Sequence, residues 1–278
     1  MISSLGFGGA TLTNLKSLRE ILQLLDLAYA NGIRHFDTAP LYGQGYSEVI
    51  YGKFLKNKRQ HVTVTTKFGL GEHNETDKMP VQLILAVNYI VKGLKKKLKG
   101  NVPDASPPFA GLPYRKIDKD LVRNSFEKSL KRLGTDHVDY YLLHEGLPSF
   151  LTDEALTYLL SLKQQGSVRN IGIGSNIEGI KQLTTQDVKV WDVLQYEHHS
   201  PGNVNELLAK FPDKLHFHHS CLRHMKEEAA AGVAQVDKAG YLLAMAALNN
   251  PKGKIIFSTR SQETFKKNID GFSKYDRK

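Results

Sequence analysis

Residues 15–37, LKSLREILQLLDLAYANGIRHFD, contain one complete helix-and-strand unit. Apolar residues recur between residues 18 and 28 at the spacing of a buried helix face, and Asn31-Gly32 is a good signal for the end of a helix. The segment that follows, residues 33–36, is short and bounded by apolar residues, which favours a strand. The stretch therefore predicts a helix over residues 15–30 that leads into a strand over residues 33–36.

The same alternation continues along the chain. Short apolar segments predict eight strands, at residues 5–8, 33–36, 62–66, 138–143, 168–173, 191–195, 215–218 and 254–257. Helices are expected at residues 15–30, 47–55, 81–98, 118–133, 152–165, 178–183, 204–210, 226–249 (broken near Gly232 and Gly240) and 262–269. Regular alternation favours a parallel sheet, and eight units in 278 residues favour a closed (β/α)8 TIM barrel.

An open doubly wound sheet is the structural alternative. Its usual dinucleotide signal, G-x-G-x-x-G, fails at the last position in residues 6–11 and again in residues 172–177. A single barrel domain over residues 1–278 is expected, because barrels of this length form one domain. Prolines between residues 103 and 113 predict a long loop insertion at about residues 69–117, in which Phe109 and Tyr114 are candidate pocket residues or ordinary loop packing.

Composition narrows the function classes. Hydrophobic residues make up 41% and charged residues 24%, as in folded globular proteins. The single cysteine, Cys221, excludes an intrachain disulfide and is expected to be a small buried residue. No secretory signal or membrane-length apolar run is found, so a cytoplasmic chain without a membrane partner is expected. The net charge of +10 is expected on solvated helix faces, and no metal-ligand spacing or nucleic-acid module accompanies it.

Polar residues follow the predicted strands at the same end. In a barrel of this kind the active site lies at the C-terminal ends of the strands. The residues there are Asp37, Lys67, His144, Ser175, Asn176, Gln195, His219, Ser220 and the segment from Ser258 to Arg260. Each alone could be a cap, a loop contact or a structural histidine, so their convergence on one mouth carries the argument. Tyr42 lies five residues after Asp37 on the same loop.

Together these residues suit carbonyl chemistry. Reduction of a carbonyl needs a hydride, which a cofactor carries, and a proton, which Tyr42 can supply. The Lys67 ammonium is expected to lower the pKa of Tyr42, with Asp37 holding the lysine in place. His144 is expected to bond the substrate oxygen or the tyrosine.

These segments resemble the aldo-keto reductase family across nearly the whole chain. Residues 32–43, GIRHFDTAPLYG, match the family pattern G-x-R-x-(I/F)-D-T-A-x-x-Y-G. The other matching segments are Ser47-Glu48 with Gly52, Thr65–Lys67, Val138–His144, Ile171–Asn176, Gln195–Glu197 and Ser258–Glu263 with Asn268. The resemblance implies a monomeric, NAD(P)-dependent oxidoreductase that interconverts small carbonyl compounds and alcohols.

Roles for individual residues follow from the resemblance. It implies that Tyr42 is the general acid/base and that Asp37, Lys67 and His144 complete a catalytic tetrad. It implies cofactor contacts by Gly9, Asp37, Ser175, Asn176, Gln195, His219, Ser258, Arg260 and Asn268. Arg260 favours NADP as the cofactor, with NAD possible.

Several features depart from the family pattern. His219 stands where family members often place an aromatic ring on the nicotinamide, and Ser258 stands where they often have a lysine. The barrel is expected to lack the N-terminal hairpin of the family, and its long C-terminal loop is expected to be absent or very short after Phe272. Two alternatives to an active reductase remain: a cofactor-binding regulatory or scaffold barrel with little turnover, and an unrelated barrel lyase or isomerase with Lys67 as a Schiff base.

Overall fold

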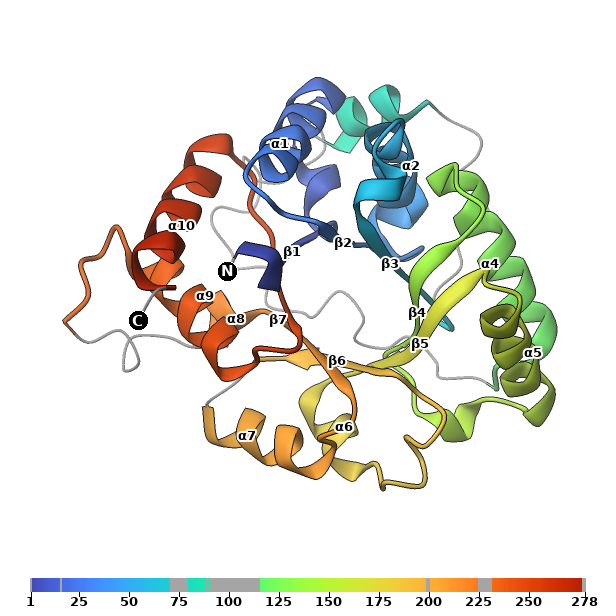
Figure 1. Cartoon of the computed structure of the whole chain (residues 1–278). Helices are drawn as coiled ribbons and strands as arrows, with labels where there is room; N and C mark the ends of the chain where they lie inside the picture. The colour runs from blue at the N-terminus through green and yellow to red at the C-terminus, as the bar shows by residue number, and fades with distance from the viewer. Residues whose placement is uncertain are drawn as a thin grey trace.

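The computed structural model describes residues 2–15, 17–70, 80–88, 90, 116–198, 201–224 and 232–276. Eight parallel strands pair in chain order, and the last pairs with the first, so the sheet closes into a barrel (Figure 1). The strands are β1 (Leu5–Gly8), β2 (His35–Asp37), β3 (Thr63–Phe68), β4 (Val138–His144), β5 (Val168–Gly174), β6 (Val193–Glu197), β7 (Leu215–His219) and β8 (Lys254–Phe257). The predicted (β/α)8 barrel is confirmed.

Helices surround the ring of strands (Figure 1). They are α1 (Leu18–Ala30), α2 (Tyr46–Leu55), α4 (Lys119–Leu133), α5 (Asp153–Gln164), α6 (Ile177–Gln182), α7 (Pro201–Lys210), α8 (Cys221–His224), α9 (Lys238–Asn249) and α10 (Gln262–Tyr275). Most of the buried apolar residues belong to the layer between these helices and the barrel. Among the residues that the structure describes, no helix combines the length and the apolar character needed to cross a membrane.

The ends of α4 form as its sequence predicts. Asp118 precedes the helix, and its side chain accepts a hydrogen bond from the backbone N–H of Leu121 at 2.8 Å. Gly134 ends the helix in the left-handed conformation, with φ of 63°. Of the expected helix over residues 81–98, residues 81–88 are helical. Residue 90 is also helical, and the other residues of that segment lie outside the described residues, as do Phe109 and Tyr114.

Some of the predicted boundaries and one predicted helix break were wrong. The second strand begins at His35 rather than at residue 33, because the backbone N–H of Ile33 donates to Ala28 of α1 and closes the end of that helix. Gly240 was expected to break a helix but lies inside α9. A Cβ atom on Gly240 would lie 2.3 Å from the backbone nitrogen of Phe272, so glycine allows α9 and α10 to touch.

The barrel interior beneath the mouth is closed by a small apolar and aromatic cluster. The His35 ring meets the rings of Tyr140 and Phe217 edge-on, with centroids 5.5 and 5.0 Å away. Its two ring nitrogens lie 2.9 and 3.3 Å from the hydroxyls of Thr63 and Thr65. Burial, with help from two nearby lysines, lowers the pKa of His35 to about 3. This histidine is therefore neutral in the folded chain at pH 7.

The neutral state of His35 predicts a pH-dependent loss of stability. Its pKa is about 3 when folded and about 6.5 when unfolded, so only the unfolded chain takes up the proton between those values. Stability from this group is present above pH 6.5 and falls by about 2–3 kcal/mol by pH 4.5. In urea unfolding at pH 7 and pH 4.5, His35→Gln should reduce the pH-dependent loss by about that amount. The exposed His61→Gln should not, and an unchanged loss in His35→Gln would contradict the assignment.

Candidate active site

A buried ion pair forms the floor of the barrel mouth. Lys67 near the end of β3 donates to both carboxylate oxygens of Asp37 at the end of β2, at 2.8 and 3.0 Å. The same ammonium donates to the carbonyl of Thr38 at 3.0 Å and to the hydroxyl of Tyr42 at 3.2 Å. Gln195 on β6 adds a hydrogen bond to Asp37 at 3.0 Å. Side chains from three strands therefore meet at one carboxylate.

A tight turn carries Tyr42 over this ion pair. It opens the short 3-10 helix η3 (Tyr42–Gly45), in which Gly43, Gln44 and Gly45 all have positive φ. A Cβ atom on Gly43 would lie 2.3 Å from the Thr13 side chain, so glycine is needed for both the conformation and the space. The turn leads directly into α2, which explains why a tyrosine five residues beyond a strand reaches back to the barrel axis.

The Ser47-Glu48 pair supports the turn from behind. The Ser47 hydroxyl donates to the carbonyl of Gly9 at 3.1 Å and accepts from the Thr38 hydroxyl at 2.9 Å. The buried Glu48 carboxylate accepts from Thr66 at 2.6 Å and pairs with Arg132 at 3.2 Å. These contacts tie α2 to its neighbouring elements, so the pair holds the loop of Tyr42 without lining the pocket.

Burial decides the pKa of Tyr42. Loss of solvent raises it, the Lys67 ammonium lowers it, and the Asp37 carboxylate raises it again, with a net rise above the ordinary value of 10.0. The expected effect of Lys67 on this pKa is confirmed in direction, but burial outweighs it. Burial alone would lower the pKa of Lys67, yet Asp37 and Tyr42 reverse this and raise it. At neutral pH, Lys67 and Tyr42 are therefore both protonated.

His144 joins the group at the end of β4. Its ring meets the ring of Tyr42 edge-on, with centroids 5.6 Å apart. Burial, then the positive charge of Lys67 and the neighbouring His219, hold the pKa of His144 well below its ordinary value of 6.5. A neutral imidazole at this place can donate a single hydrogen bond to a bound oxygen atom. The four residues expected from the sequence to form one group do meet at the barrel mouth.

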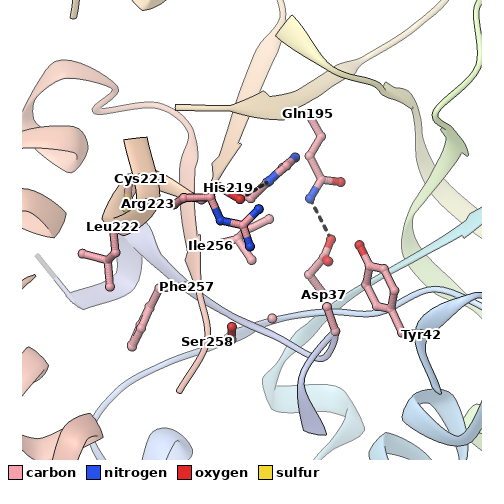
Figure 2. Close-up of a pocket in the computed structure, with 13 residues that line it drawn as sticks. Asp37, Tyr42, Gln195, His219, Cys221, Leu222, Arg223, Ile256, Phe257 and Ser258 are labelled. Atoms are coloured by element: carbon pink, nitrogen blue, oxygen red, sulfur yellow. Dashed lines mark hydrogen bonds between the residues drawn. The ribbon is translucent and has the colours of Figure 1, made fainter. Parts of the chain in front are cut away.

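A pocket of about 230 Å³ opens above Asp37 and Tyr42 (Figure 2). Its wall includes Gln195 from β6 and His219 from the end of β7. The other residues that line it are Gly8, Ala10, Ser220, Cys221, Leu222, Arg223, Ile256, Phe257 and Ser258. Cys221 is buried, as expected, and burial raises the pKa of its thiol to about 12. Among the described residues, no cluster of three or more His, Cys, Asp or Glu side chains is arranged to hold a metal ion.

The end of β5 places Ser175 and Asn176 beside this pocket rather than in its wall. Ser175 is buried, and its backbone N–H donates to the carbonyl of Gln195 at 3.0 Å. The Asn176 side-chain oxygen accepts from the N–H of Gly179 at 2.8 Å and caps α6. The cap uses only this oxygen and leaves the side-chain N–H donors of Asn176 uninvolved in it. The side-chain oxygen of Gln195 is buried without a hydrogen-bond partner among the described residues.

Besides Ser175 and Asn176, three more of the expected cofactor residues do not line the pocket. A Cβ atom on Gly9 would meet Ser47 and Tyr51, so this glycine serves packing, while its neighbours Gly8 and Ala10 face the pocket. Arg260 is exposed just beyond β8. Asn268 is buried on α10.

The structure adds two charged residues that sequence reasoning overlooked. Glu145 follows His144 directly, with φ of 52°, and its N–H donates to the Gly174 carbonyl at 2.5 Å. Arg223 lies in α8, four residues after His219, and lines the pocket. Both belong to segments that follow a strand, which is where functional residues gather in such barrels, and that position was the available signal.

A model of the aldo/keto reductase family matches residues 4–211, more than half of the chain. The chain therefore belongs to the aldo/keto reductase family. The matched region contains Asp37, Tyr42, Lys67, His144 and Gln195, and it ends before β7.

Several relatives of the chain are named as oxidoreductases. The chain is 31% identical over 174 residues to the uncharacterized oxidoreductase YqkF of Bacillus subtilis, covering 63% of this chain and 45% of that protein. It is 32% identical over 185 residues to the D-threo-aldose 1-dehydrogenase of a Pseudomonas species, covering 63% of this chain and 51% of that protein. It is 34% identical over 149 residues to the NADH-specific methylglyoxal reductase of Escherichia coli, covering 52% of this chain and 38% of that protein. The matches thus span about half the length of the curated relatives. An aldo-keto reductase from Bacillus halodurans, solved in its holo form, shares the fold with a TM-score of 0.67 at 20% identity, covering 99% of this chain and 90% of that one.

Proposed function

We propose that the chain catalyses NAD(P)H-dependent reduction of aldehydes or ketones to alcohols, or the reverse oxidation, with Tyr42 as the general acid/base. The observation that carries the proposal is the contact of the Lys67 ammonium with both the Asp37 carboxylate and the Tyr42 hydroxyl at the floor of the pocket. The family and the oxidoreductase names of its relatives support the same reaction class.

The contacts of Tyr42 define what it does. An ammonium only donates hydrogen bonds, so the Tyr42 oxygen accepts from Lys67 and keeps its own proton for a bound carbonyl oxygen. The tyrosinate left after proton transfer faces the same ammonium, which stabilises the developing charge. His144, neutral at this place, donates a second hydrogen bond to the carbonyl oxygen. Asp37 positions Lys67 and balances its charge.

The mouth also fits a nicotinamide cofactor. The buried, unpartnered oxygen of Gln195 needs an N–H donor, and a carboxamide supplies one. Ser175 and Asn176 would hold the other side of that carboxamide, and the His219 ring would lie against the nicotinamide. When bound, the cofactor supplies the hydride. We propose NADP, with Arg260 and Ser258 toward its adenosine side, and NAD as the alternative, since one relative is named NADH-specific.

A titration and a turnover assay test the proposal. NADPH and NADH are titrated against the chain while their fluorescence is followed, and turnover of 4-nitrobenzaldehyde is then measured. We expect binding of at least one dinucleotide and steady consumption of it with the aldehyde. Binding without turnover of any aldehyde would instead support a regulatory or scaffold barrel. A chain that binds neither dinucleotide overturns both functions.

Glu145 predicts a dependence of activity on substrate charge. Burial, and then the neighbouring Glu197, raise the pKa of Glu145 to about 7, and its negative charge acts on Tyr42. The side chain is neutral below pH 7 and anionic above it. From pH 6 to pH 8, kcat/KM for 4-carboxybenzaldehyde should therefore fall about fivefold relative to 4-nitrobenzaldehyde, since like charges near a protein surface repel by about 1 kcal/mol.

Two matched variants separate the effect of the Glu145 charge on kcat/KM from other effects of pH on the enzyme. In Glu145→Gln the ratio of the two substrates should stay constant across this range. The same substitution at the exposed Glu127 should leave the ratio as pH-dependent as in the parent chain. A ratio that still changes about fivefold in Glu145→Gln would remove Glu145 from the substrate side of the pocket.

A further inference from the structure

Two charged residues, Asp37 and Arg223, line the pocket above Tyr42. The Asp37 carboxylate is neutralised by Lys67. Arg223 is the other charged residue in the pocket wall. Figure 2 shows its guanidinium directed into the pocket, beside His219 and Ile256 and on the side away from Tyr42. The pocket wall therefore carries a net positive charge at Arg223, because Lys67 neutralises Asp37.

Arg223 lacks an acidic partner within the described part of the chain. Its backbone N–H donates to the Ser220 carbonyl at 2.8 Å, while its side chain is exposed and enters no ion pair with a described carboxylate. By contrast Arg59, Arg132 and Arg169 all pair with buried carboxylates. A guanidinium at a pocket wall that no described carboxylate neutralises can bind a phosphate with two parallel hydrogen bonds.

The order of groups along the pocket identifies the phosphate. The nicotinamide has to lie near Tyr42, because the hydride and the proton reach the same carbonyl, and Gln195 and His219 are placed to hold it. Ser258 marks the opposite end, toward the adenosine. The group that links the two halves of a dinucleotide is its diphosphate, and Arg223 lies between those ends.

We propose that Arg223 binds the diphosphate of the nicotinamide dinucleotide and is the main cationic contact for it in the pocket. This assignment rests on the proposed function and adds a residue outside the region matched by the family model, which ends at residue 211. Since NADH and NADPH share the diphosphate, Arg223 serves both cofactors equally, and the choice between them lies elsewhere.

Calorimetric titrations of Arg223→Gln with NADPH, NADH and ADP-ribose test the assignment. Loss of one charge-assisted contact at a partly solvated site should weaken all three by about tenfold. ADP-ribose contains the diphosphate but no nicotinamide, so its loss of affinity is a readout independent of turnover. Arg223→Lys should recover part of the affinity, and the exposed Arg19→Gln should bind all three as the parent chain does.

Each other outcome has a distinct meaning. A loss confined to NADPH would place Arg223 on the 2′-phosphate and overturn the assignment. Unchanged affinity for all three, with a higher KM for 4-carboxybenzaldehyde, would place it on an anionic substrate and also overturn it. If the parent chain binds none of the three ligands, the proposed function itself fails. Equal thermal melting of parent and Arg223→Gln chains verifies that the exposed substitution leaves the fold intact.

Discussion

Tyr42→Phe is expected to lower kcat for carbonyl reduction by about 10²–10⁴-fold, the range that a positioned general acid contributes. The substitution removes the proton that reaches the carbonyl oxygen and leaves the ring contact with His144 in place. Dinucleotide affinity should stay within about twofold, because the substitution leaves the proposed carboxamide contact of Gln195 and the proposed phosphate contact of Arg223 untouched. Single-turnover kinetics with 4-nitrobenzaldehyde, together with a binding titration, measure the two effects separately.

A remote tyrosine supplies the control for this experiment. Tyr158 lies on α5, away from the barrel mouth, and Tyr158→Phe should retain the parent kcat. Retention of more than about a tenth of the parent rate by Tyr42→Phe would show that another group or water delivers the proton. In that case His144 would become the leading donor, and His144→Gln would be the variant to measure next.

Lys67→Met is expected to destabilise the fold by about 3–5 kcal/mol, the typical cost of removing one partner from a buried ion pair. Lys67 and Asp37 are each almost fully buried, so the substitution leaves the Asp37 carboxylate without its counter-charge. The hydrogen bond from Gln195 to that carboxylate would remain, but an amide carries no charge to offset it. Urea unfolding at pH 7 gives the change in the free energy of unfolding.

Removing the charge of Asp37 as well should restore much of the stability that Lys67→Met loses. The double variant Asp37→Asn with Lys67→Met leaves no member of the pair charged. Its free energy of unfolding should therefore exceed that of the single variant by about 2 kcal/mol or more, because the main cost of the single variant is an unpaired buried charge. Carbonyl reduction should stay low in both variants, because neither carries the ammonium beside Tyr42. A single variant within about 1 kcal/mol of the parent chain would mean that water enters and solvates Asp37.

The convergence of the tetrad could be predicted because it depends on topology alone. Once eight helix-and-strand units are recognised, the residues after each strand must meet at one end of the barrel. The ends of α4 were predictable for a local reason, since Asp118 and Gly134 act within one helical turn of their neighbours.

What escaped prediction depends on contacts distant in sequence. In the sequence Gly240 predicts a helix break. Only the structure shows that this glycine lies within α9 because α10 packs directly against it. The net pKa of Tyr42 follows from the depth of its burial, which a list of neighbouring charges does not contain. Glu145 and Arg223 lie close in sequence to residues that were recognised. Whether their side chains approach the barrel mouth depends on the path of the chain after each strand, which the sequence pattern does not give.

The pairing of β8 with β1 has a consequence for how this chain is made. Leu5 pairs with Ile255, so the two strands come from opposite ends of the sequence, yet they form adjacent sides of the pocket, with Gly8 and Ala10 facing Ile256 and Ser258. During synthesis β1 is made first and must keep an open edge until the last strand leaves the ribosome. The pocket is thus complete only after β8 has paired, and a chain stalled before β8 leaves the edge of β1 unpaired and prone to aggregation.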